Sequence, residues 1–118
     1  MGCGRLFEGT ADQMWHSLQK IKALPEETQI YCSHEYTQAN GAFALTLEAN
    51  NKALQQRIQQ VKQLRAQNLP TIPCSLALEM ATNPFLREDS PEIQSSIGML
   101  GQSENKVFQV IRELKDKF

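Results

Sequence analysis

The sequence has little of several features that mark large classes of proteins. Its 118 residues carry 12 basic and 13 acidic side chains, so there is no excess positive charge for binding nucleic acid or an anionic membrane surface. The three cysteines, Cys3, Cys32 and Cys74, form no CxxC pair, which argues against a disulfide framework and a closed zinc site. No apolar run approaches the roughly 20 residues of a membrane span, and no signal-peptide pattern opens the chain. We therefore expect a cytoplasmic protein, short enough for one domain, with no nucleic-acid or membrane partner.

Most of the chain has the apolar spacing and capping residues of helices. Thr10 and Gln13 have the form of a capping box, which predicts a helix from about Ala11 that Pro25 ends. Its expected buried face consists of Met14, Trp15, Leu18, Ile21 and Leu24. Further helices are expected over residues 38–48, from a cap at Asn50 through Gln67, over 76–81, between Ser90 and Gly101 with Leu100 facing inward, and from Ser103 onward.

One segment, Thr28–Cys32, is typical of a strand because it is rich in β-branched and aromatic residues. A single strand cannot satisfy its own backbone groups, so either Gly4–Phe7 or strands from outside the chain should pair with it. Thr37 is expected to cap the helix that follows. Residues 31–37, YCSHEYT, thus place polar side chains at the end of a strand, where α/β-type proteins commonly bind ligands and metals.

Residue chemistry alone leaves the function of this polar cluster open. A single loop histidine such as His34 is more often a hydrogen-bonded residue than a metal ligand. His34 and Glu35 do not form an HExxH motif, and Cys32 with His34 would supply only two ligands. The glycines at the start of the chain match no phosphate-binding loop, and no nucleophile elbow is present.

Three blocks in order carry a family resemblance. They are GCGRLFEGT at residues 2–10, YCSHEYT at 31–37 and PTIPCSLALEMATNPFLR at 70–87. Together they resemble the second half of glyoxalase II, the hydroxyacylglutathione hydrolase of the metallo-β-lactamase superfamily. The resemblance implies an α+β, mostly helical chain. Residues 1–49 would be a remnant of the catalytic αββα sandwich, and residues 50–118 the C-terminal helical domain that binds glutathione.

The resemblance also implies roles for five single residues. His34 matches a ligand of the family's binuclear metal site, which holds zinc, with iron or manganese as alternatives. Arg5 and Arg87 match cations that hold glutathione. Tyr36 matches a tyrosine that contacts glutathione, and Phe7 stands where other members have a tyrosine.

Two motifs of the family are absent, and their absence shapes the prediction. Neither THxHxDH, which supplies most metal ligands, nor GDxLF occurs in the 118 residues, and Glu88 and Asp89 stand where members can have a lysine. We therefore expect a C-terminal fragment, with Met1 an added initiator or an incidental residue. The complete form would hydrolyse S-D-lactoylglutathione to D-lactate and glutathione in methylglyoxal detoxification, and the fragment alone would be inactive. The alternative hypothesis is a non-catalytic helical module that self-associates through an exposed sandwich remnant.

Overall fold

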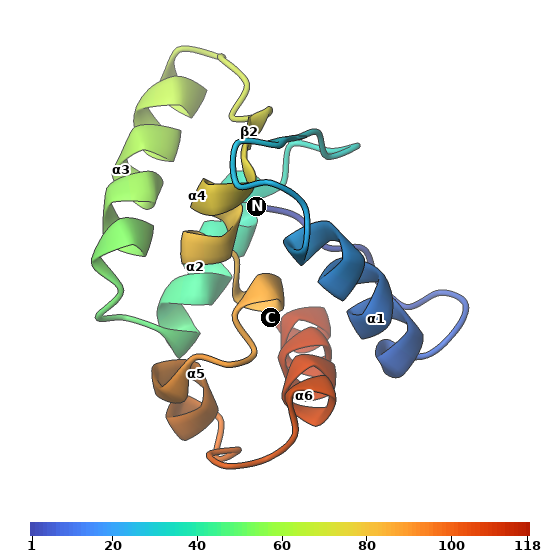
Figure 1. Cartoon of the computed structure of the whole chain (residues 1–118). Helices are drawn as coiled ribbons and strands as arrows, with labels where there is room; N and C mark the ends of the chain where they lie inside the picture. The colour runs from blue at the N-terminus through green and yellow to red at the C-terminus, as the bar shows by residue number, and fades with distance from the viewer.

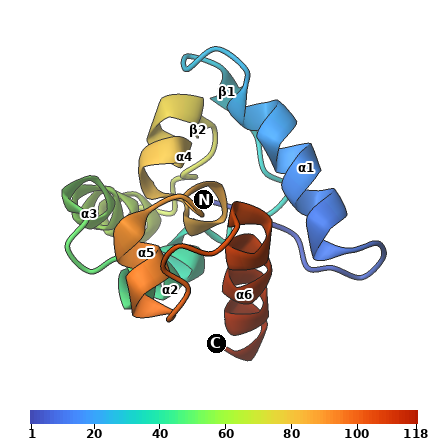
Figure 2. The same cartoon turned by 60° about the horizontal axis from the view of Figure 1, so that its bottom comes forward.

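Six α-helices and one short 3-10 helix make up most of the computed structural model, which describes residues 1–118. They are α1 (Ala11–Lys22), α2 (Thr37–Leu47), α3 (Lys52–Ala66), α4 (Leu76–Thr82), η1 (Pro84–Leu86), α5 (Pro91–Ser96) and α6 (Glu104–Lys117). Figure 1 shows α3 along one side of the molecule and α1 with α6 on the other, and Figure 2 shows the same separation. None of the six α-helices has the length and apolarity that crossing a membrane requires. The expectation of a mostly helical chain is confirmed.

The pairing predicted for the strand is wrong. The strand β1 is only Gln29–Ile30, and it pairs antiparallel with β2, Cys74–Ser75, rather than with Gly4–Phe7. Two further backbone bonds beside the sheet, Leu76 N–H to Thr28 O at 2.8 Å and Ala77 N–H to Glu26 O at 2.9 Å, continue the contact into α4. The partner therefore comes from the segment before α4, which pairs with one edge of β1 from within the chain.

Local capping chemistry explains where most helices begin. At α1, the Thr10 hydroxyl accepts the Gln13 N–H at 3.1 Å, and the Gln13 side chain accepts the Thr10 N–H at 2.9 Å, so the capping box is confirmed. The hydroxyls of Ser75 and Ser90 cap α4 and α5 as expected.

Three predicted helix ends are wrong. The cap of α3 is Asn51, whose side chain accepts the Leu54 N–H at 3.1 Å, and not Asn50. Thr37 is the first residue of α2 rather than its cap, because its side chain is turned inward and fully buried. The helix α5 ends at Ser96, and glycines at positive φ follow it, so Leu100 is exposed instead of facing inward.

The core lies between α2, η1, α5 and α6. Its seven buried residues are Phe43, Leu47, Phe85, Ile93, Val107, Phe108 and Ile111. Met14, Trp15 and Leu18 of α1 pack against it but stay partly exposed, so α1 has no fully buried residue. The predicted buried face of α1 is therefore only half covered, and Ile21 and Leu24 are exposed. A second cluster of Met1, Ala44 and Leu54 joins α2 to α3.

Candidate functional site

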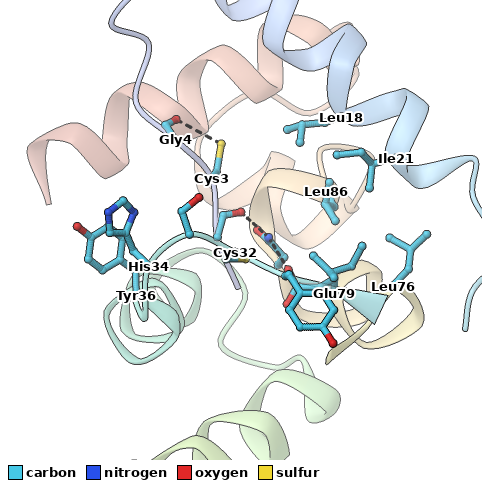
Figure 3. Close-up of a pocket in the computed structure, with 15 residues that line it drawn as sticks. Cys3, Gly4, Leu18, Ile21, Cys32, His34, Tyr36, Leu76, Glu79 and Leu86 are labelled. Atoms are coloured by element: carbon cyan, nitrogen blue, oxygen red, sulfur yellow. Dashed lines mark hydrogen bonds between the residues drawn. The ribbon is translucent and has the colours of Figure 1, made fainter. Parts of the chain in front are cut away.

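An open cavity of about 450 Å³ lies where the N-terminal segment meets α1, the sheet and α4. Its apolar lining comes from α1, β1, α4 and η1, and its polar end is the loop between β1 and α2. Figure 3 shows the two ends: His34 and Tyr36 lie at one, and Leu18, Ile21, Leu76 and Leu86 line the other. This cavity has an apolar wall beside a few polar groups, which is the composition of a small-molecule site.

His34 and Tyr36 present their rings together at the polar end of the cavity. The ring centroids are 5.0 Å apart and the planes differ by 8°, so the rings are stacked. Both side chains are accessible, with Tyr36 57% exposed. The pair is therefore available to a ligand that enters the cavity.

Glu35, between these two residues, is held by the segment that leads to β2. Its carboxylate accepts the Thr71 N–H at 2.6 Å and the Thr71 hydroxyl at 2.8 and 2.9 Å. Burial acts to raise the pKa of Glu35, but the bonds from Thr71, the charge of Arg65 and the N–H of Thr37 outweigh it and lower that pKa. The Glu35 carboxylate thus makes its hydrogen bonds to groups of the protein itself.

Arg5 and Phe7 lie on the exposed loop before α1 and do not line the cavity. Phe7 is 86% exposed. Arg5 Nε lies 3.8 Å from Asp116 Oδ1 on α6, and Arg112 Nη2 donates to the same oxygen at 3.0 Å. Two guanidinium groups therefore converge on one carboxylate oxygen.

Sequence reasoning missed Arg112. Its Nη1 donates to the carbonyls of Cys3 and Gly4 at 3.1 and 3.2 Å, and its guanidinium lies 4.7 Å from the ring centroid of Phe85. Arg112 thus fixes the backbone directly before Arg5. The available signal was its spacing, because Arg112 lies four positions after Phe108 and therefore on the buried face of α6.

Arg87 lies away from these residues and is bonded within the helical part of the chain. Its Nε and Nη2 donate to the two carboxylate oxygens of Glu48 at 2.9 and 2.6 Å, and Nη1 donates to the Met80 carbonyl at 3.0 Å. The hydrogen bond to Glu48 is the main cause of a raised Arg87 pKa. Arg87 does not line the cavity, so it is not brought together with His34 and Tyr36.

The residues of the chain do not by themselves fit a metal ion. No group of three or more His, Cys, Asp or Glu side chains is arranged to hold one. Glu35 is turned to Thr71, and burial raises the pKa of the Cys3 and Cys32 thiols, which disfavours the thiolate that binds metal. His34 fits a metal site only as one member of a larger ligand set.

Comparison with known proteins decides the family. A family model described as "Hydroxyacylglutathione hydrolase C-terminus" matches residues 35–118. The chain belongs to the hydroxyacylglutathione hydrolase C-terminus family. Over its whole length it is 53% identical to the hydroxyacylglutathione hydrolase of Methylococcus capsulatus, 51% to that of Maricaulis maris and 52% to that of Bartonella tribocorum. It covers 46%, 46% and 47% of these relatives, so the chain spans about half the length of the curated relatives it matches.

The predicted resemblance to hydroxyacylglutathione hydrolase is confirmed by this membership. The family match includes Tyr36 and Arg87, whereas Arg5, Phe7 and His34 lie before its first residue, Glu35. Those three residues fall within the longer alignment to the relatives, which covers the whole chain.

Proposed function

We propose that this chain is the carboxyl-terminal part of a hydroxyacylglutathione hydrolase that converts S-D-lactoylglutathione to D-lactate and glutathione. The observation that carries the proposal is the cavity whose polar end presents His34 and Tyr36, in a chain of this family. His34 would be one ligand of a binuclear metal site of zinc, or of iron or manganese. Most of the other ligands would belong to the THxHxDH motif, which these 118 residues lack. When bound, such a metal pair would supply a hydroxide nucleophile for thiolester cleavage.

Glutathione would be recognised by Tyr36 at the polar end of the cavity and by the loop that follows Gly4, which leads out of the cavity lining. Its two carboxylates call for cations, and arginine suits a carboxylate because its fork can bind both oxygens. Arg5, whose side chain is 62% exposed and whose Nε lies 3.8 Å from Asp116, is the cation available for one carboxylate. Tyr36 and Phe7 would contact the rest of the glutathione.

Arg87 remains a proposed glutathione contact of a more limited kind. Three of its N–H groups donate to Glu48 and Met80, which leaves two of the about five donors of a guanidinium group free. A glutathione carboxylate would have to bind beside Glu48 rather than replace it.

The exposed apolar side chains before residue 32 support the proposal that the chain begins with a sandwich remnant. In the proposal, residues 1–49 belong to a catalytic αββα sandwich, and residues 50–118 form the helical domain that binds glutathione. The helix α1 has no fully buried residue, and Ile21, Leu24 and Tyr31 are exposed. Such a face is what a sandwich layer would leave uncovered in the absence of its partner layer. A cytoplasmic location, consistent with three unpaired cysteines, is part of the same proposal.

Two assays on the 118-residue chain test this function. We expect no hydrolysis of S-D-lactoylglutathione with zinc present, because His34 alone cannot assemble a metal pair, and the Methylococcus capsulatus relative serves as the positive control. We also expect calorimetry to detect binding of S-methylglutathione, a thioether that cannot be hydrolysed, and Tyr36→Ala to weaken it. Turnover by the chain would contradict the expected inactivity. Failure to bind the thioether would contradict the proposed glutathione site.

The same exposed face favours the alternative function, a non-catalytic helical module that self-associates. Pairing of two copies would cover Ile21, Leu24 and Tyr31. Light scattering tests this hypothesis directly. A particle mass that stays at one chain up to about 100 μM excludes self-association at dissociation constants well below that concentration.

A further inference from the structure

We propose that Glu35 is a positioning residue that holds the stacked His34–Tyr36 pair at the polar end of the cavity through Thr71 and Arg57. The inference deepens the proposed function and rests on it, since it takes these two rings as the parts that meet the metal and the glutathione. Glu35 itself would touch neither. Its role is to fix the backbone from which both rings project.

The first step is the set of hydrogen bonds that Thr71 donates to Glu35. One carboxylate receives the Thr71 N–H at 2.6 Å and the Thr71 hydroxyl at 2.8 and 2.9 Å. Thr71 is buried and Glu35 is half-buried, so the donors are shielded from water while part of the carboxylate stays accessible. Hydrogen bonds to an ionised acceptor are shorter and stronger than those between neutral groups. The loop between β1 and α2 is therefore tied at this point to the segment before β2.

The second step anchors Thr71 to the longest helix. Arg57 of α3 is buried and donates from Nη2 to the Thr71 carbonyl at 2.9 Å, while its Nη1 donates to Gln60 at 2.7 Å. Arg65 also lies on α3, and its positive charge favours the ionised form of Glu35. Thr71 is therefore anchored to a helix of 15 residues.

The third step connects the Thr71–Glu35 hydrogen bonds to the His34 and Tyr36 rings. The loop bends at Ser33 and His34, and the contacts of each residue show where its side chain points. The His34 and Tyr36 rings are stacked at 5.0 Å and 8°, while the residue between them, Glu35, binds Thr71. Tyr36 is also the residue before α2 and has no side-chain cap bond of its own. Glu35 therefore sets the direction in which both rings enter the cavity.

The test compares four variants of the 118-residue chain. Glu35→Gln keeps the shape but removes the charge, and Thr71→Val removes the hydroxyl donor but keeps the N–H. Thr71→Ser restores the hydroxyl, and Glu27→Gln is the matched control, since Glu27 is exposed near β1. Two properties are measured. The first is the ring-current shift of the His34 protons by NMR, and a fifth variant, Tyr36→Leu, gives the reference value without the tyrosine ring. The second is the dissociation constant for S-methylglutathione.

We expect Glu35→Gln to remove most of the His34 ring-current shift and to raise the dissociation constant about tenfold. Thr71→Val should do the same to a smaller extent, about threefold, while Thr71→Ser and Glu27→Gln should match the unmodified chain. Retention of the ring shift in both Glu35→Gln and Thr71→Val overturns the inference, whatever happens to binding. If the unmodified chain does not bind the thioether, the proposed glutathione site fails, and the NMR measurement still decides the role of Glu35.

Discussion

Glu48 is the residue whose replacement should reveal most about how the helical part of the chain is held together. It follows α2, is only 4% exposed, and its carboxylate accepts four hydrogen bonds. Two come from Arg87, one from the Ser90 hydroxyl at 2.8 Å and one from the Asn51 amide at 3.1 Å. A single side chain thus links the end of α2 to the starts of α3 and α5 and to η1.

The expected cost of Glu48→Gln follows from what the change leaves behind. Removing one partner of a buried ion pair typically costs about 3–5 kcal/mol, because the other charge stays buried without compensation. Arg87 is 26% exposed on its side chain, so water can solvate part of the guanidinium, and glutamine still offers one acceptor oxygen. We therefore expect a loss of about 2–3 kcal/mol in the free energy of unfolding. Glu26→Gln, at an exposed site, should change it by less than about 0.5 kcal/mol.

The stability lost in Glu48→Gln should depend on pH in a definite direction. Burial acts to raise the pKa of Glu48, but the bonds from Arg87, Asn51 and Ser90 outweigh it and lower that pKa. A carboxyl whose pKa is lower in the folded state stabilises the fold fully above its unfolded pKa, about 4.3 for glutamate. That stabilisation is lost as the pH falls through the folded pKa. The gap between the original chain and Glu48→Gln should therefore be widest near pH 7 and narrow below pH 4.

Urea unfolding followed by circular dichroism at pH 7, 5 and 3 measures this gap. The slope of free energy against urea should be the same for both chains, which shows that only stability has changed. A gap that is as wide at pH 3 as at pH 7 would refute the electrostatic reasoning. A loss no larger than that of Glu26→Gln would refute the structural role of Glu48.

Two further predictions concern other buried groups. Burial, followed by the charge of Glu79, raises the pKa of Cys74 to about 12. In a background without the other cysteines, Cys74 should therefore react with Ellman's reagent at pH 8 roughly fiftyfold more slowly than an ordinary thiol, since the smaller thiolate fraction outweighs the higher nucleophilicity of that thiolate. A rate within about threefold of an ordinary thiol would contradict this. Glu88 is fully buried and accepts bonds from Trp15, Gln19 and Lys22 of α1 on one oxygen. Glu88→Gln should loosen α1, shifting Trp15 fluorescence to the red and speeding amide exchange in α1 about tenfold. Unchanged exchange would show that apolar contacts alone hold the helix.

Helix starts were predictable where the signal is local. The Thr10–Gln13 box and the caps at Ser75 and Ser90 each depend on residues within three positions, and the structure has all of them. The cap of Thr37 failed because a longer-range effect, burial of its side chain, outweighed the capping preference. The strand pairing failed for the same reason. Ile30 and Cys74 are partners across 44 positions, and nothing in either dipeptide specifies the other.

Residue type argued against burial of the charges that the structure buries. Glu48, Arg57, Glu88 and Arg112 are all buried, although charged side chains are rarely buried. Arg57 and Arg112 lie at helical spacing from Leu54 and Phe108, so periodicity alone places them on the buried faces of α3 and α6. Each compensates the cost of burial with partners that are distant in sequence, such as Arg112 with the Cys3 and Gly4 carbonyls. The family resemblance pointed to residues 31–37, several of which line the cavity, but could not show that Glu35 binds Thr71 while the rings on either side of it stack.

A motif match also cannot distinguish a residue that binds substrate from one that holds the fold, and Arg87 is the case in point. Its two-pronged bond to Glu48 occupies the geometry with which arginine would grip a ligand carboxylate, whereas Arg5 and Tyr36 are exposed and have free polar groups. If Arg87 contacts glutathione, it does so with the donors that Glu48 leaves over. The two roles separate in Arg87→Lys, which keeps the charge but cannot bridge both carboxylate oxygens. Loss of stability with unchanged affinity for S-methylglutathione would assign Arg87 to the fold alone, and loss of both would assign it a share in each.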